Sequence, residues 1–165
     1  MIPPRDSPVR PRRSALYMPG ANIRALEKAK SLPADVLILD LEDAVAPDAK
    51  AAARQHVLAA VRSGFGHREV VVRINGLRTR WGRDDLDAVA DLGVSAILLP
   101  KVESGAQLQD LAALLHQAGA FPGLRIWAMI ETPLAIRVWR SWRESWLRSF
   151  MCRMPGASWR SPCGG

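Results

Sequence analysis

The sequence predicts an α/β protein built on a parallel β-sheet, and three observations support this. Apolar runs rich in valine and isoleucine alternate with segments of helical periodicity, as expected for parallel strands buried on both faces. The connections are mostly short, which favours right-handed strand–helix–strand crossovers. Four of the runs end in charged or amide side chains, and an α/β barrel builds its active site at the C-terminal ends of its strands. The pattern alone leaves a barrel and a doubly wound sheet open.

Five segments are predicted to be strands: residues 15–18, 36–39, 70–72, 96–99 and 124–130. The first stops at Pro19-Gly20. No GxGxxG follows any of them, which disfavours a dinucleotide-binding fold. The later four are followed at once by polar groups: Asp40-Leu41-Glu42-Asp43, Arg73-Ile74-Asn75, Lys101-Val102-Glu103 and Glu131-Thr132.

Four helices are predicted to connect the strands, at about residues 22–31, 47–62, 84–92 and 104–118. Asn22 is placed to cap the first, and Pro47 suits the first turn of the second. Gly93 and Gly119 end the third and fourth. The predicted inner face of the second helix is Ala51, Arg54, Leu58 and Val61, and that of the fourth is Leu108, Leu111, Leu114 and Leu115.

Composition divides the chain into three parts. Residues 1–13, with four prolines and four arginines, are predicted to be a disordered basic arm. Residues 14–136 form the predicted folded domain, and 137–165 form an irregular tail rich in tryptophan and arginine. The formal net charge of +7 separates into +3 in the arm, −1 in the domain and +5 in the tail. Because the excess lies at the two ends rather than along one surface, nucleic-acid binding is not expected.

Several other classes of protein are disfavoured. Cys152 and Cys163 lack CxxC spacing and a nearby histidine, so neither a metal site nor a disulfide framework is indicated. No apolar run reaches the roughly 18 residues of a membrane helix, and no secretory signal precedes the domain. A cytoplasmic enzyme without a membrane partner is therefore expected. The three histidines, His56, His67 and His116, are predicted to be solvated.

Five motifs in this order closely resemble the HpcH/HpaI aldolase and citrate lyase family: residues 13–20 (RSALYMPG), 39–45 (LDLEDAV), 72–75 (VRIN), 99–104 (LPKVES) and 129–133 (MIETP). The resemblance covers about residues 13–135 and is best to the citrate lyase β-subunit-like branch. Members of that branch cleave CoA thioesters such as citryl-CoA or malyl-CoA.

The resemblance implies a (β/α)₈ TIM barrel with Mg²⁺ at its C-terminal mouth, assembled into homo-oligomers. It makes Glu131 a metal ligand and Arg73 the group that holds the oxo-acid, so both are candidate catalytic and substrate-binding residues. The family's second ligand is an aspartate after the next strand, whereas no aspartate follows Asp110 here. Only the first five β/α units are expected, and the departure at about Ile136 indicates a truncation or frameshift that impairs activity.

Three further residues complete the candidate site. Glu42 and Asp43 are placed either to orient metal-bound water or to form a structural pair beside the strand end. Lys101 is interpreted first as a structural lysine at the end of its strand. The chemistry expected is Mg²⁺-assisted cleavage of a CoA thioester to an acyl-CoA and an oxo-acid.

Three alternatives remain open. The first is aldol cleavage of a free hydroxy-oxo-acid. The second is a non-catalytic half-barrel that associates with intact homologues, because five strands cannot close a barrel and leave two open edges. The third is a nucleic-acid binder driven by the tail, in which Trp139, Trp142 and Trp146 alternate with arginines.

Overall fold

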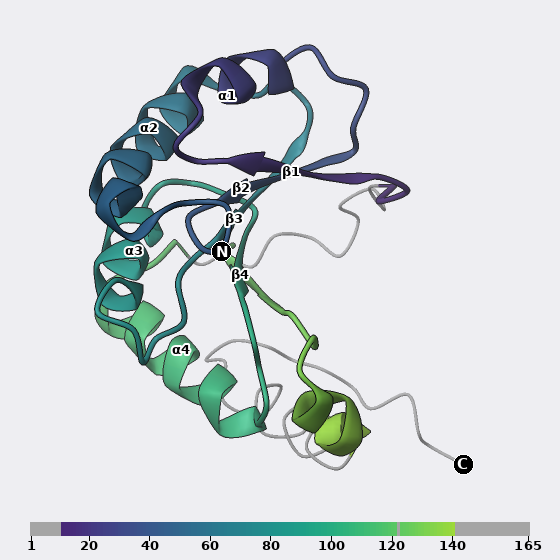
Figure 1. Ribbon diagram of the computed structural model, residues 1–165, viewed down its shortest axis with the longest axis vertical. Coiled ribbons are helices and arrows are strands. Elements are labelled where there is room, and N and C mark those ends of the chain that lie inside the picture. Colours follow the sequence, from purple (N-terminus) through teal and green to yellow (C-terminus); the bar gives the residue numbers. More distant parts are fainter. Residues whose placement is uncertain (1–10, 122, 141–165) are drawn as a thin grey trace.

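The computed structural model describes residues 11–121 and 123–140 and has a curved parallel sheet covered by helices (Figure 1). The strands are β1 (Ala15–Pro19), β2 (Val36–Asp40), β3 (Glu69–Arg73), β4 (Ala96–Leu99) and β5 (Arg125–Ala128). The helices are α1 (Ile23–Ala29), the 3₁₀ helix η1 (Pro47–Ala49), α2 (Lys50–Ser63), α3 (Gly82–Val89) and α4 (Gly105–Gln117). Residues 133–140 are also helical.

The strands lie in the sheet in the same order as in the sequence, β1-β2-β3-β4-β5, and every neighbouring pair is parallel. A doubly wound sheet reverses its strand order at a switch point, whereas a barrel adds each strand beside the previous one. The observed order is therefore that of five consecutive β/α units of a barrel. This confirms the predicted fold class and settles the choice that the sequence pattern left open.

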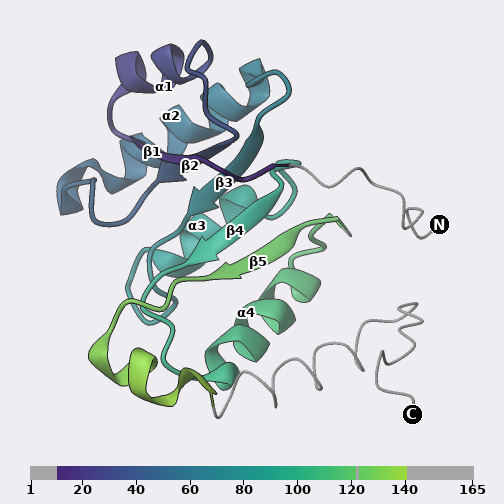
Figure 2. The same ribbon diagram turned by 90° about the vertical axis from the view of Figure 1, so that its right-hand side faces the viewer.

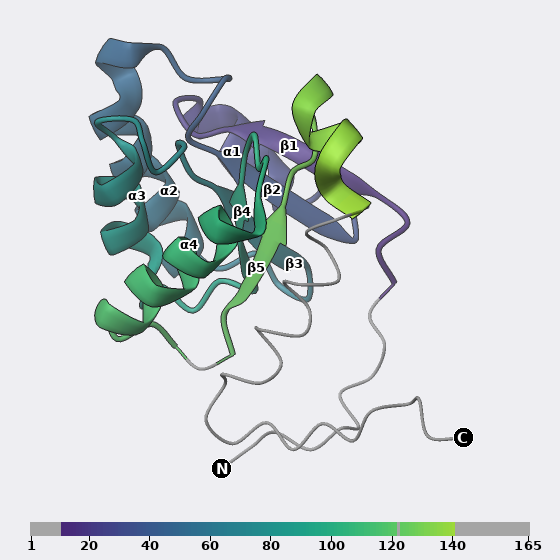
Figure 3. The same cartoon turned by 90° about the horizontal axis from the view of Figure 1, so that it is seen from below.

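The helices cover one face of the sheet. Figure 1 shows α1 to α4 as a row along the outer, convex side, and Figure 2 shows the same arrangement with β5 nearest the viewer. Seen from below in Figure 3, helix 133–140 lies apart from this row, beyond the end of β5. The concave face of the sheet is therefore the side away from α1–α4.

Alternation along the strands divides the core into two clusters. The larger lies between sheet and helices and includes Leu37, Leu39, Val72, Ile97 and Leu99. The smaller lies on the concave face and consists of Val36, Ile38, Val71, Ala96 and Leu98, with Trp127 and Met129 packed against it. Every residue of β2 and of β4 is buried, as predicted for central parallel strands. The edge strands β1 and β5 are more exposed, because each has one neighbour only among the described strands.

The helix ends follow the predicted local signals. The Asn22 side chain accepts a 3.0 Å hydrogen bond from the backbone N–H of Ala25. Ser104 and Gln107 form a reciprocal capping box at the start of α4. Gly93 and Gly119 have φ angles of 74° and 68°, a left-handed conformation that glycine adopts without a side-chain clash.

The predicted inner face of α2 was partly wrong. Its buried residues are Lys50, Ala53, Val57, Leu58 and Ala60. Ala51 is exposed, and Arg54 and Val61 are only half-buried. Pro47 begins the separate helix η1, so α2 starts at Lys50 and its phase differs from the prediction. His56 was also predicted to be solvated, but it is half-buried and its Nδ1 is a buried atom without a hydrogen-bond partner among the described residues.

The start of the described chain is tied to the sheet. Arg12 donates hydrogen bonds of 2.6 and 2.9 Å to the carboxylate of the buried Glu69, and Arg13 is paired with Asp35. These two arginines were assigned to the disordered arm. Residues 1–10 of that arm, the tail beyond residue 140 and both cysteines lie outside the described residues, so their predictions stay untested. No helix in the described ranges has the length and apolar character needed to cross a membrane.

Candidate active site

Charged side chains gather at the C-terminal ends of the strands. Asp40 and Arg73 are the last residues of β2 and β3, and the parallel register pairs them directly. Both belong to the concave face, because residues two apart on a strand share a face and Ile38 and Val71 lie there. The loops after β2, β4 and β5 add four charged side chains: Glu42, Asp43, Lys101 and Glu131.

Arg73 and Asp40 form a buried, bidentate ion pair. Arg73 Nε donates to Asp40 Oδ1 at 2.7 Å, and Nη2 donates to Oδ2 at 2.6 Å. The backbone N–H groups of Glu42 and Ala44 also donate to this carboxylate. Burial by itself raises the pKa of Asp40, but the hydrogen bonds from Arg73 and the backbone outweigh it and hold the pKa below its ordinary value. The same contact with Asp40 raises the pKa of Arg73.

This pair changes what Arg73 can offer a ligand. The sequence suggested that its planar fork would hold a substrate carboxylate with two parallel bonds, but the Nε–Nη2 edge is occupied by Asp40. The remaining nitrogen, Nη1, lies 3.2 Å from Glu42 Oε2 and 3.9 Å from Met129 Sδ. Nη1 is therefore the nitrogen of Arg73 that Asp40 leaves free, and a ligand that used it would share it with Glu42.

Lys101 links the acidic residues of two loops. Its ammonium donates to Glu42 Oε1 and, at 3.2 Å, to Asp43 Oδ1, and its pKa is raised chiefly by the hydrogen bond to Glu42. Its backbone has a φ of 52°, the left-handed region that non-glycine residues seldom occupy. In this conformation its N–H donates to Glu131 Oε1 at 3.0 Å. Strain of this kind is characteristic of functional sites.

Glu131 is exposed just before helix 133–140. The next residue, Thr132, caps that helix, since its Oγ1 accepts a 3.1 Å hydrogen bond from the N–H of Ala135. Thr132 also donates to Glu103 Oε1 at 2.7 Å. Glu131 is thereby held at the mouth of the concave face with one carboxylate oxygen bonded to Lys101.

The donor set can be tested against Mg²⁺. This ion prefers oxygen ligands and keeps several waters, so one or two protein carboxylates suffice. Glu131 is an exposed carboxylate and fits this requirement. Over residues 11–121 and 123–140, however, no three or more histidine, cysteine, aspartate or glutamate side chains are grouped closely enough to hold a metal. Glu131 is therefore the candidate ligand that the described chain offers to Mg²⁺.

A buried polar network supports the loop after β2. Lys50 Nζ donates to the carbonyl oxygens of Leu41 and Glu42 at 2.8 and 2.6 Å. Asn75 Nδ2 donates to the same Leu41 carbonyl at 2.8 Å and to Asp85 at 2.6 Å. Burial lowers the pKa of Lys50. Two buried donors therefore fix the turn that carries Glu42.

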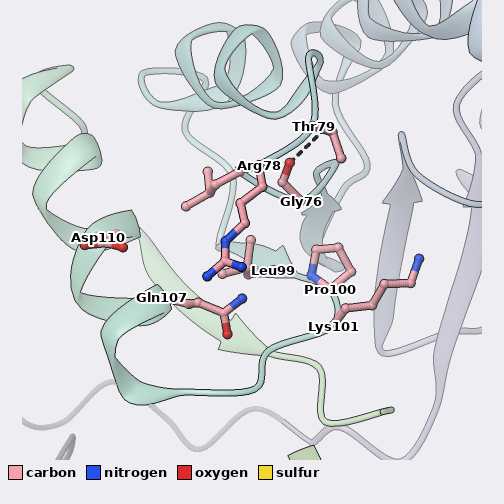
Figure 4. A pocket seen from close by; sticks show the side chains of 9 residues that line it. Gly76, Arg78, Thr79, Leu99, Pro100, Lys101, Gln107 and Asp110 are labelled. Atoms are coloured by element: carbon pink, nitrogen blue, oxygen red, sulfur yellow. Dashed lines mark hydrogen bonds between the residues drawn. The ribbon is translucent and has the colours of Figure 1, made fainter. Parts of the chain in front are cut away.

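A pocket of about 190 Å³ lies on the helix side of Lys101, between the loop after β3 and the start of α4 (Figure 4). Arg78, Gln107 and Asp110 are among its lining residues. Lys101 also lines this pocket, although its side chain extends away from Arg78, Gln107 and Asp110 in Figure 4. The ammonium binds Glu42 and Asp43, so the pocket adjoins the charged cluster through Lys101.

A comparison with models of protein families shows which family the chain belongs to. The model of the HpcH/HpaI aldolase/citrate lyase family matches residues 13–140. The chain belongs to this family. The match includes all the strands and all the candidate site residues.

Curated members of the family are similar over a shared segment. The chain is 50% identical over 123 residues to a (3S)-malyl-CoA thioesterase of Cereibacter sphaeroides strain KD131, covering 74% of this chain and 41% of that protein. It is 37% identical over 133 residues to the citrate lyase subunit beta of Escherichia coli K12, covering 77% of this chain and 44% of that protein. The chain thus spans less than half the length of these relatives.

A solved structure of a family member has the same fold. The citrate lyase beta subunit from Mycobacterium tuberculosis, complexed with oxaloacetate and magnesium, is 32% identical with a TM-score of 0.60. The similarity covers 77% of this chain and 52% of that one.

The candidate site residues predicted from the sequence are brought together by a chain of contacts. Arg73 Nη1 contacts Glu42, Glu42 contacts Lys101, and the Lys101 N–H contacts Glu131. Asp43 lies beside Lys101. The catalytic, substrate-binding and metal-binding roles of these residues remain predictions.

Sequence reasoning missed other residues that the structure places at or behind the site: Asp40, Tyr17, Met129, Lys50, Asn75 and Asp85. Asp40 stood among the polar groups noted after the second predicted strand, but its pairing with Arg73 follows only from the observed register of β2 against β3.

Proposed function

We propose that the chain carries part of the active site of an Mg²⁺-dependent carbon–carbon lyase that cleaves a CoA thioester of the malyl-CoA or citryl-CoA type. The observation that supports this proposal most is a cluster of contacting charged side chains at the C-terminal strand ends: Arg73, Glu42, Lys101 and Glu131. Membership of a family whose relatives include a citrate lyase subunit supports the reaction class. The ligand expected is small: a CoA thioester or the oxo-acid derived from it.

The reaction needs two proton transfers and one bond cleavage. The hydroxyl of the malyl or citryl group loses its proton, and its carbon becomes the carbonyl carbon of the oxo-acid. The electron pair of the broken carbon–carbon bond passes to the thioester, which leaves as an enolate and is protonated to the acyl-CoA. The protein's task is to hold the oxo-acid portion and to stabilise the charge that moves.

The chain's own residues suit parts of this task. Arg73, held by Asp40, presents Nη1 to an anionic group of the substrate. Glu131 is the residue that would hold Mg²⁺, with Glu42 and Asp43 near it through Lys101. When bound, Mg²⁺ supplies Lewis-acid polarisation of the substrate oxygens.

Thioester hydrolysis is the second candidate, because the relative at 50% identity is a malyl-CoA thioesterase. The two reactions give different products from the same substrate. The lyase converts malyl-CoA to acetyl-CoA and glyoxylate, whereas hydrolysis gives malate and free CoA. The organic products therefore decide between them.

The test incubates the full chain with malyl-CoA or citryl-CoA and Mg²⁺, and separates the CoA species by chromatography. Acetyl-CoA with an equimolar oxo-acid supports the lyase. Free CoA without an oxo-acid supports the thioesterase and contradicts the lyase. Turnover of a free hydroxy-oxo-acid, but not of its thioester, would favour the aldolase alternative. Arg73→Met and Glu131→Gln are the controls, since activity of this site must depend on both.

We also propose that the chain self-associates through the edges of its sheet. β1 and β5 are the outer strands of the described sheet, and exposed strand edges pair readily with other chains. Size-exclusion chromatography with light scattering gives the oligomeric state directly. A monodisperse monomer over a tenfold range of concentration would contradict this proposal.

A further inference from the structure

Two hydrogen-bond donors of the concave face converge on one sulfur atom. The Tyr17 hydroxyl donates to Met129 Sδ at 3.8 Å, and Arg73 Nη1 donates to the same atom at 3.9 Å. A thioether is a weak acceptor, whereas a phenol hydroxyl and a guanidinium are strong donors. A ligand oxygen that displaced this sulfur and lay about 3 Å from both donors would therefore make two better hydrogen bonds.

Tyr17 is held beside Arg73 by packing. The Arg73 Cζ lies 4.9 Å from the centroid of the Tyr17 ring, within the range of a cation–π contact. The register places Tyr17 opposite Ile38, on the concave face that also carries Arg73. The side chain is nevertheless 39% exposed. A ligand at the mouth of the concave face can thus reach the hydroxyl.

The hydroxyl is a donor at neutral pH. Burial of the ring raises the pKa of Tyr17 above its ordinary value of about 10, and the opposing effect of Arg73 is smaller. The phenol therefore keeps its proton in the range where an oxo-acid is ionised. An ionised carboxylate and a protonated phenol form a charge-assisted hydrogen bond.

We propose that the Tyr17 hydroxyl and Arg73 Nη1 together bind one oxygen of an oxo-acid, which replaces the sulfur of Met129. The acid class of the ligand rests on the proposed function, while the pair of donors rests on the geometry alone. Arg73 attracts the anion in competition with Glu42, whose Oε2 lies 3.2 Å from Nη1, and Tyr17 fixes the position of one oxygen beside it. Tyr17 is accordingly a substrate-binding residue that selects for an oxygen atom at that point.

The sequence offers a direct probe, because Tyr17 is the only tyrosine in the chain. Tyrosine labelled with ¹³C at Cζ gives one signal, whose chemical shift responds to hydrogen bonding of the hydroxyl. The full chain is titrated with oxaloacetate in the presence and absence of Mg²⁺, and binding is measured in parallel by calorimetry. We expect a saturable shift of the Tyr17 signal with the same midpoint as the heat of binding.

Two variants separate the hydroxyl from the ring and the sulfur. Tyr17→Phe keeps the ring over Arg73 and removes the donor, so oxaloacetate affinity falls about tenfold. Its thermal midpoint stays that of the parent chain, because the hydroxyl's present partner is a weak one. Met129→Leu removes the sulfur: it shifts the signal of the ligand-free chain and leaves the oxaloacetate-induced change in place.

The outcomes distinguish this proposal from the proposed function. Oxaloacetate binding that leaves the Tyr17 signal and the affinity of Tyr17→Phe unchanged overturns the role of Tyr17, while the proposed function stands. The Tyr17 signal can also shift saturably with acetate or pyruvate while CoA thioesters give no response and no turnover. That result supports the Tyr17–Arg73 site and contradicts the proposed lyase function. Absence of both heat and shift with every acid, with or without Mg²⁺, overturns the site.

Discussion

Asp40 and Arg73 are joined across β2 and β3 by two parallel hydrogen bonds of 2.7 and 2.6 Å. The side chains are 1% and 8% exposed, so the pair is removed from water. The bidentate geometry fixes the guanidinium plane, because rotation would break both bonds at once. Asp40 thereby determines which nitrogen of Arg73 faces the site.

Removing one partner of this pair should be costly. Asp40→Ala leaves the buried Nε–Nη2 edge of Arg73 without an acceptor and Glu42 as its remaining close carboxylate, which we expect to lower the free energy of unfolding by about 3 kcal/mol. The double variant Asp40→Leu with Arg73→Met removes both charges and should recover much of that loss. Urea denaturation measures the free energy of unfolding of each variant. The control is Asp43→Ala, whose side chain is 62% exposed, and its effect should stay below about 1 kcal/mol. Equal effects of the two alanine substitutions would contradict the buried-pair interpretation.

The same pair predicts an acid-labile fold. An unfolded aspartate has a pKa of about 3.9, and that of folded Asp40 is lower. Between these values the unfolded chain binds more protons, so stability rises with pH. The contribution of Asp40 is present above the unfolded pKa and is lost as pH falls through the folded pKa. Denaturation measured from pH 2 to 6 should show this slope.

Two matched variants show which aspartate causes the pH dependence of stability. The hydrogen bond from Arg13 lowers the pKa of the half-buried Asp35 to about 2, so Asp35 titrates in the same acid range. Asp40→Asn should flatten the pH dependence of stability, and Asp35→Asn should remove a separate part of it. An unchanged slope in Asp40→Asn would show that the ion pair does not govern acid stability.

The fold was largely predictable from local pattern. Central strands such as β2 are apolar throughout because both their faces are buried, and this signal needs no tertiary information. Asn22 and Ser104 likewise act on their own helix ends. The phase of α2 was not predictable in the same way. The buried face of α2 includes Lys50 and Ala53 in place of the predicted Ala51 and Arg54, and this offset depends on what packs against the helix.

The site was predictable only where a motif marked it. Arg73 and Glu131 were identified by family resemblance, and the structure links them through Glu42 and Lys101. The occupied edge of Arg73 was missed because it depends on the register of β2 against β3. The contact of Tyr17 with Met129 was missed for a similar reason, since it joins residues 112 positions apart.

Lys50 should stabilise the loop that carries Glu42. The Lys50→Met substitution keeps the length of the side chain but removes the donors to the Leu41 and Glu42 carbonyls. Each carbonyl keeps a second donor, from Asn75 and from the Val45 N–H respectively. We therefore expect a loss of about 2 kcal/mol in unfolding free energy, measured by chemical denaturation. Lys28→Met on the exposed side of α1 is the control and should change stability by less than about 0.5 kcal/mol. A loss of unfolding free energy in Lys50→Met no larger than in this control would mean that Lys50 does not stabilise the loop.

Glu131 should govern metal affinity without governing stability. Glu131→Gln removes one negative charge, while the amide oxygen can still accept the hydrogen bond from the Lys101 N–H. Because Mg²⁺ prefers charged oxygen ligands and Glu131 is exposed, Mg²⁺ affinity should fall by about tenfold or more at unchanged thermal midpoint. Glu103→Gln makes the same charge change at a carboxylate that accepts from Thr132, so it reports the general loss of negative potential. Calorimetric titration with Mg²⁺ should separate the two variants, because the Mg²⁺ affinity of Glu103→Gln should stay within about threefold of that of the parent chain. An equal loss in both variants would mean that Glu131 acts through the local potential and does not bind the ion directly.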